Sequence, residues 1–462
     1  MKRVLAIARL TFWEGIRMRV VLVCLIVLVI LVLRMPFALR GDETLAGRLQ
    51  NFLAYSLGAL SLLLSLTTAF FSCATLSGEF KSRSLHLVVT KPVSRFQILV
   101  GKWLGVNLLN ILILALCGAA IYGLACFIRS RPEQFARDRY KIRDVVWTAR
   151  HAARPVVPEQ EIAETAAARV NSLIQQGELD KTRRLPALAE EISAGTKRWR
   201  VVQPGYVADY RFENLTPPEH PDTVIQVRFK VVAQPVPMDE MVTIGWAFCD
   251  PNSGAPLGPP TWTRERNSAV HQFLVRAAPV IRNGQALLQV FNDPTRGSTT
   301  FIFDGEDSLQ ILYKVGGFEL NFVRALLIIL LRLTLLSALG VFFSVFVSFP
   351  VACLCTLSFY VICLGLPFWL EAMGAGNEGL APQFDPFGVF GSAIRTLLVP
   401  LVKLGFPDFS HYDGVDRLID GVYIPYSLLA GGLIHTLLYG AALLFGPGWL
   451  IFRSREVAEV QV

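Results

Sequence analysis

Six long apolar runs constrain this chain more than any other feature. A helix needs about 20 mostly apolar residues to cross the hydrocarbon core of a membrane. Such runs lie at residues 20–33, 52–76, 104–128, 326–347, 351–370 and 426–452. Of the 462 residues, 53% are hydrophobic and 17% are charged, which excludes an ordinary soluble protein. The sequence therefore predicts an α-helical membrane protein with six transmembrane helices.

Lysines and arginines near the ends of these runs predict the orientation. Cytoplasmic loops and termini carry an excess of both residues. The basic residues are Lys2, Arg3, Arg9, Arg17 and Arg19 before the first run and Arg453 and Arg455 after the last. We expect a multi-pass protein of the cytoplasmic (inner) membrane with both termini in the cytoplasm. The net charge of +8 fits this topology, and we expect no nucleic-acid partner. We also expect the first run to be kept as a span, although a cleaved signal peptide is the alternative.

The segment between the second and third runs, residues 77–102, is basic and compatible with a short helix. Its candidate functional residues are Glu79, Lys81, Arg83, Lys91, Pro92, Arg95, Gly101 and Lys102. The excess of positive charge predicts a cytoplasmic location, because short basic loops are retained there. We interpret this segment as a docking loop for a partner protein.

A polar region, residues 129–318, separates the third run from the fourth. Because three spans precede it, we expect an inserted extracytoplasmic α+β domain. Residues 158–195 favour two helices interrupted at Pro186. Alternating apolar and polar residues predict strands at 223–232, 242–248, 270–275, 286–291 and 308–314. Turn residues separate these strands, so residues 199–318 are predicted to form an antiparallel, jelly-roll-like β-sandwich.

Two groups of side chains in this insert have alternative interpretations. The first group is Trp199, Tyr206, Tyr210, Trp246 and Trp262, which either stack on a sugar or fill the core. The second is Asp304, Glu306 and Asp307, which either bind Ca²⁺ or form a solvated turn. Aromatic residues in strands pack into cores more often than they bind ligands, and acidic turns are usually solvated. We therefore favour core packing and a turn.

Two further segments suit the membrane interface. Residues 1–19 place Val4, Leu5, Ala8 and Phe12 on one helical face, which predicts an interfacial entry helix. Residues 372–424, between the fifth and sixth runs, are too long for a simple turn. They are either an outer re-entrant or amphipathic segment, or an ordered loop.

Polar residues in or beside the apolar runs are candidates for a transport pathway. A charge in hydrocarbon is costly and usually faces a partner or water. Arg332, Glu371 near an outer end and His435 fit this description. The alternatives are an arginine that reaches back to the interface and a histidine that bonds a neighbouring helix.

The sequence offers no catalytic or metal-binding pattern. Seven of the eight cysteines lie in or beside the apolar runs, which leaves Cys249 alone in the polar insert, and the histidines are scattered singly. The P-loop pattern GxxxxGK[ST] is missing, because Trp103 follows the glycine and lysine at 101–102. We therefore expect a protein that is not itself an enzyme and that binds no cofactor or metal.

The membrane portion resembles the permease subunits of ATP-binding-cassette (ABC) exporters of the type-2 fold. The motifs that carry the resemblance are an acid at Glu79, PVSR at residues 92–95 and GK at residues 101–102. The entry helix and the segment between the last two spans resemble those of the family too. The resemblance implies that residues 1–128 and 319–462 form the permease, with 77–102 as a coupling loop. It also implies a separate ABC ATPase subunit that binds ATP, and a second permease copy, identical or related.

The large insert departs from a minimal member of this family, so the substrate is not implied. The insert is a candidate for binding a periplasmic protein or a glycan, and the complex would then work on that partner rather than move a solute. A different class is also open, in which the chain is a membrane-anchored scaffold or sensor whose sandwich binds an envelope polymer or protein.

Overall fold

The computed structural model describes most of the chain. The described residues are 2–38, 44–81, 93–131, 141–372 apart from 178, 180–182, 219, 221–222 and 306, then 399, 400, 402, 409, 412 and 414–454. They divide into two units, Met1–Ile142 with Gly317–Val462, and Arg143–Gly316. We describe each unit by itself.

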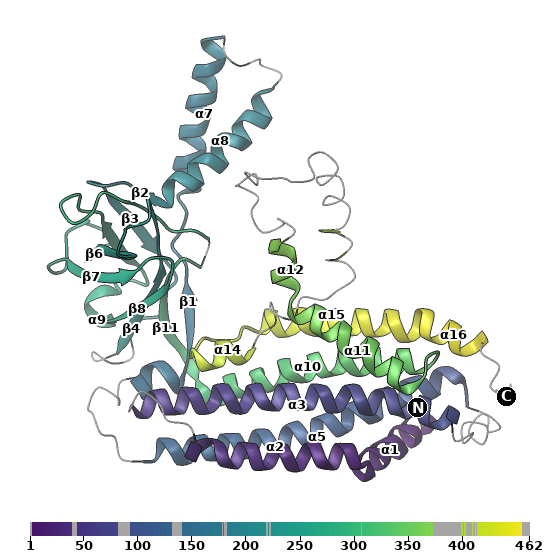
Figure 1. Cartoon of the computed structure of the whole chain (residues 1–462). Helices are drawn as coiled ribbons and strands as arrows, with labels where there is room; N and C mark the ends of the chain where they lie inside the picture. The colour runs from purple at the N-terminus through teal and green to yellow at the C-terminus, as the bar shows by residue number, and fades with distance from the viewer. Residues whose placement is uncertain are drawn as a thin grey trace. The chain divides into compact units, whose positions relative to one another are not determined.

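The first unit is helical (Figure 1). Its elements before the insert are α1 (Lys2–Arg17), α2 (Arg19–Ala38), α3 (Leu45–Lys81) and α5 (Arg95–Arg129). After the insert come α10 (Phe318–Ser344), α11 (Phe349–Leu364), α12 (Leu366–Ala372), α14 (Gly414–Ile419), α15 (Tyr426–Leu443), the π-helical turn η3 (Leu444–Gly448) and α16 (Trp449–Ser454). Helices α3, α5 and α10 pack on one another, and α2 and α15 extend the layer.

Three helices of the described chain, α3, α5 and α10, are long and apolar enough to cross a membrane. The pair α1 and α2 meets the same test when taken together, with a bend of 62° between them. Helix α11 is apolar but has 16 residues, and α15 has 18. The protein is thus membrane-embedded with three or four qualifying helices, and the count of six spans stays a prediction.

The bounds of the predicted loop 77–102 need correction, because both of its ends are helical. Helix α3 continues to Lys81, and α5 begins at Arg95. The start of α5 is fixed by a capping box, in which the Ser94 hydroxyl accepts from the Gln97 amide at 3.2 Å and the Gln97 side chain accepts from the Ser94 amide at 3.3 Å. These bonds satisfy donors that a helix otherwise leaves open.

The last predicted span, 426–452, is also corrected, because it is not continuous. Helix α15 passes into η3, where Gly446 has a non-helical backbone and Pro447 follows it. Proline cannot donate a backbone hydrogen bond and clashes with the preceding turn. The helical path therefore breaks before α16.

The entry helix is present as α1, and the face that it buries within the protein consists of small residues. Its position at the membrane interface stays a prediction. The buried residues of α1 are Ala8, Thr11 and Gly15, whereas Leu5 is 61% exposed. Small residues replace large apolar ones on this face because α1 packs closely against α5. Of the four side chains on the predicted apolar face, Val4, Leu5, Ala8 and Phe12, Ala8 alone is buried.

The second unit contains three antiparallel sheets and a helical hairpin. Its elements are β1 (Thr148–Ala153), α7 (Glu159–Gln175), α8 (Arg184–Trp199), β2 (Val201–Val202), β3 (Val207–Phe212), β4 (Val224–Lys230), β5 (Val232–Gln234), β6 (Met241–Cys249), β7 (Thr261–Arg266), β8 (Val270–Arg276), α9 (Ala277–Val280), β9 (Ala286–Phe291), β10 (Thr300–Ile302) and β11 (Leu309–Gly317). The π-helical turn η1 (Lys141–Val146) precedes β1. The sheet orders are β1-β11-β4-β8, β2-β10-β5 and β3-β9-β6-β7.

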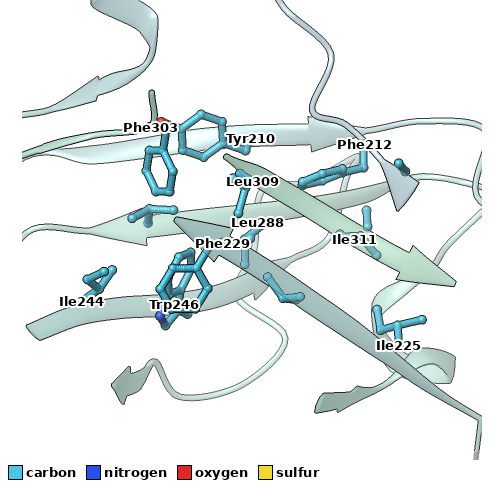
Figure 2. Packing of buried hydrophobic residues seen from close by; sticks show 14 of the residues in the cluster. Tyr210, Phe212, Ile225, Phe229, Ile244, Trp246, Leu288, Phe303, Leu309 and Ile311 are labelled. Atoms are coloured by element: carbon cyan, nitrogen blue, oxygen red, sulfur yellow. The ribbon is translucent and has the colours of Figure 1, made fainter. Parts of the chain in front are cut away.

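All five predicted strands are present, as β4, β6, β8, β9 and β11. Val227 pairs with Phe273 across β4 and β8, and Trp246 pairs with Val290 across β6 and β9. The inward side chains of all three sheets share one core, part of which Figure 2 shows. The face-to-face packing of a jelly-roll-like sandwich stays a prediction.

The aromatic residues that had two interpretations fall into different surroundings. Tyr210 and Trp246 are at most 2% exposed and belong to the core, and Trp199 packs against it. Trp262 lies beneath the Arg296 guanidinium, with 4.2 Å from the Arg296 Cζ to the ring centroid, and Tyr206 is exposed. These side chains therefore form no common sugar platform.

The acidic turn holds no metal-binding cluster among the residues that the structure describes. Asp307 instead accepts from the Arg154 guanidinium at 2.8 Å and from the Gln310 amide at 2.6 Å. Glu306 lies outside the described residues. The solvated turn therefore stays a prediction.

Cys249, at the end of β6, is a buried free thiol. Burial raises its pKa, with a further contribution from Asp209, so the reactive thiolate is scarce at neutral pH. We expect N-ethylmaleimide to leave Cys249 unmodified in the native protein, whereas an exposed thiol introduced nearby as Ser253→Cys reacts. Peptide mass spectrometry measures both. Equal modification of the two thiols before denaturation would contradict the buried position.

Candidate functional site

A buried ion pair joins the end of α3 to the first turns of α5. The Lys102 ammonium lies 2.7 Å from a carboxylate oxygen of Glu79, and the two side chains are 2% and 14% exposed. Both residues come from the predicted coupling segment, although neither lies in a loop. Removing one partner of a buried pair leaves a charge without compensation, so the pair fixes α3 and α5 to each other.

A second carboxylate, Glu14 of α1, stands near this pair. Its charge interacts favourably with Lys102 and unfavourably with Glu79. One cation therefore serves two anions from different helices. We name Glu14, Glu79 and Lys102 the junction charges.

Two glycines of α5 bring α1 into backbone contact. A Cβ at Gly101 would lie 2.7 Å from the Ile7 Cβ, and one at Gly105 would lie 2.6 Å from the Thr11 Cβ and 2.7 Å from the Ala8 carbonyl oxygen. The spacing is Gly-x-x-x-Gly, which lets membrane helices approach closely. Gly101 thus has a packing role and is not part of a loop.

Arg95 connects the start of α5 to the end of α16. Its Nη1 donates to the carbonyl oxygens of Phe452 and Arg453, the latter at 3.0 Å. The last carbonyls of a helix lack intrahelical donors, so an arginine is a suitable partner for them. Around this contact, Phe452 packs in a core with Leu76 of α3, Ile98 of α5 and Val341 of α10.

The Ser94 cap fixes the start of α5. We expect Ser94→Ala to lower the free energy of unfolding by about 1 kcal/mol, because the Gln97 amide loses its acceptor. Denaturant unfolding in detergent measures this change. The matched control is Ser130→Ala just beyond the other end of α5, and an effect as large there would contradict a specific role of the cap.

A second polar cluster lies within the same unit, between α10 and α15. Arg332 and His435 line one cavity of about 20 Å³, together with Phe409 and Tyr412. His435 Nδ1 and the Tyr412 hydroxyl form a hydrogen bond of 2.7 Å. The Arg332 Nη2 donates to the Phe409 carbonyl at 3.2 Å, and the guanidinium lies 5.5 Å from the centre of the Phe409 ring.

The cavity in this cluster is small. Its volume is close to that of one water molecule, so it is not a passage for a solute in this conformation. Arg332 finds a backbone carbonyl and an aromatic face, and its Nε has no partner among the described residues. His435 bonds the Tyr412 side chain, and a role of His435 in transport stays a prediction.

The structure brings together some of the predicted site residues and leaves others apart. Glu79 and Lys102 form an ion pair, and Arg332 and His435 line one cavity, whereas Arg95 contacts α16 and Gly101 packs against α1. Lys81 ends α3 and Glu371 lies in α12, but their side chains are outside the described part. Arg83, Lys91 and Pro92, as well as most of residues 372–424, also lie outside the described residues.

Four contributing residues were missed from the sequence. Ser94 and Gln97 form the pattern S-x-x-Q, a capping signal that was available. Glu14 carried a weaker signal, since it is the one acid among the first 40 residues. No sequence pattern indicates Tyr412, because its partner His435 lies in a separate element, α15.

The helices that surround the junction charges belong to a membrane-embedded protein, because α3 and α5 are long and apolar enough to cross a membrane. Residues 5–135 match the family model described as ABC-2 family transporter protein, which confirms the resemblance seen in the sequence. Residues 5–135 are thus similar to the membrane region of ABC-2 transporters, which supports a permease component of an ABC transporter. The match includes α1, α2, α3 and α5 but neither the second unit nor α10–α16. No curated protein and no solved structure was found to match the chain.

Proposed function

We propose that this chain is the permease subunit of a type-2 ABC exporter, and that it moves its substrate with ATP hydrolysed by a separate subunit. The ATPase docks on the segment between α3 and α5, on the cytoplasmic side. Two permease copies form the passage. The six spans, the extracytoplasmic position of the second unit and its jelly-roll-like sandwich are part of this proposal.

One observation carries the proposal. The helices that meet at the junction charges, α1, α3 and α5, are those within the matched residues 5–135. Helices that merely anchor a domain need no buried ion pair at one end, because burying charges costs free energy. A buried pair at the base of two long helices suits a part that must transmit force.

In the proposed mechanism, each of these contacts couples the movement of two helices. The ion pair moves the ends of α3 and α5 together, the glycines of α5 carry α1 with them, and Arg95 carries α16. Closure of two ATPase subunits would press on the intervening segment and displace these helices as a group. The noncatalytic role of the chain follows, because the chemistry belongs to the ATPase.

The proposal is tested by purifying the tagged chain from its native membrane. We expect an ATP-binding protein with a P-loop sequence to co-purify with the wild type and to be lost with Arg95→Glu. The control is Arg129→Glu at the opposite end of α5, which should retain the partner. Mass spectrometry identifies the partner. Recovery of no such protein, or equal loss with both variants, would favour the anchored scaffold instead.

A further inference from the structure

The second unit contains a pocket that the proposed transport cycle does not use. Its volume is about 220 Å³. That is below the roughly 300–1,000 Å³ of sites for drug-sized ligands. It suits a molecule no larger than one aromatic ring with a short substituent.

Most of the pocket wall is apolar. It includes Trp199 at the end of α8, Tyr210 of β3, and Phe303 and Leu309, which flank the turn before β11. The Tyr210 ring packs at 5.2 Å from Trp199 and at 5.3 Å from Phe303, measured between ring centroids. Figure 2 shows Tyr210, Phe303 and Leu309 close together at one end of the core. The wall is thus a continuation of the core that a ligand can reach.

The charged residues of the pocket are Arg154 and Arg200. Arg154 is bound to Asp307, whose carboxylate balances its charge. Arg200 has no ion pair with any described carboxylate, and its charge acts on the neighbouring Tyr210 hydroxyl. Arg200 therefore provides the positive charge beside the aromatic wall.

We propose that this pocket binds a small organic monoanion, a carboxylate on an apolar body. The carboxylate pairs with the Arg200 guanidinium, whose planar donors match two carboxylate oxygens. The apolar body lies against Tyr210, Trp199 and Phe303, where its removal from water favours binding. Neither contact depends on transport, so the site is a ligand sensor or a docking point of the second unit in its own right.

Fluorine NMR of para-fluorophenylacetate with the full-length protein in lipid nanodiscs tests the proposal. We expect the signal to broaden on binding, and Arg200→Gln to weaken the affinity about tenfold, which corresponds to ~1.4 kcal/mol. The matched control is Arg264→Gln on β7, an exposed arginine paired with Asp239 outside the pocket, which should leave the affinity unchanged.

Two further probes separate the parts of the proposal. The neutral alcohol 2-(para-fluorophenyl)ethanol should bind more weakly than the acid, because it lacks the charge. Glucuronate, a carboxylate without an apolar body, should compete poorly. The assignment would be overturned if the acid and the alcohol bind equally, or if glucuronate competes strongly. It would also be overturned if Arg200→Gln leaves the affinity unchanged, or if the acid does not bind.

Discussion

Lys102→Met is expected to be the most damaging single substitution in the membrane unit. It removes the cation that lies 2.7 Å from the largely buried Glu79 carboxylate, a group that also interacts unfavourably with Glu14. Breaking a buried pair in this way costs about 3–5 kcal/mol, since the remaining charge is not solvated. Denaturant unfolding of the purified protein in detergent measures the loss of free energy of unfolding.

The companion variant is the double substitution Lys102→Met with Glu79→Gln. The second substitution removes the negative charge of Glu79, which lay beside the lost cation. We therefore expect the double variant to be more stable than Lys102→Met. A double variant that is less stable than the single one would contradict the electrostatic explanation. It would show instead that packing around the side chains determines the loss.

Gly105→Leu is expected to separate α1 from α5. Even the Cβ of the new side chain would stand 2.6 Å from the Thr11 Cβ and 2.7 Å from a backbone oxygen of α1, and a backbone cannot move aside cheaply. Overpacking of this kind costs about 1–3 kcal/mol. We expect faster cleavage by trypsin after Arg9 and Arg17, both of which lie in α1.

A matched control exists on the same helix. A Cβ at Gly123 of α5 meets no atom within 4 Å, so Gly123→Leu should leave the trypsin pattern of α1 unchanged. If both variants expose α1 to the same extent, the effect belongs to the loss of glycine in general and not to the contact with α1.

The periodic parts of the fold were predictable from the sequence. Alternation revealed β4, β6, β8, β9 and β11, because each has an apolar face toward a core. It missed β7, whose sequence TWTRER lies at the edge of its sheet and is largely polar. An edge strand needs no continuous apolar face, so periodicity detects it only where its sequence alternates, as it does in the edge strand β8 but not in β7.

Helix ends were harder than helix interiors. The sequence predicts that Pro186 interrupts the helices of residues 158–195. In the structure it lies in the first turn of α8, where no backbone donor is required. The charge of Lys102 led to its assignment to the predicted loop, residues 77–102. Its partner Glu79 is 23 residues away, and a sequence gives no sign that such a distant acid lies within hydrogen-bonding distance.

The most direct test of the account is a photo-cross-link at the start of α5. A photoreactive amino acid at Phe96, 38% exposed in the first turn, should capture an ABC ATPase in native membranes. The same group at Leu116, 59% exposed further along α5, should not. Capture at Phe96 alone would establish the α3–α5 junction as the docking site. Capture of no ATPase at Phe96, or equal capture at both positions, would contradict it.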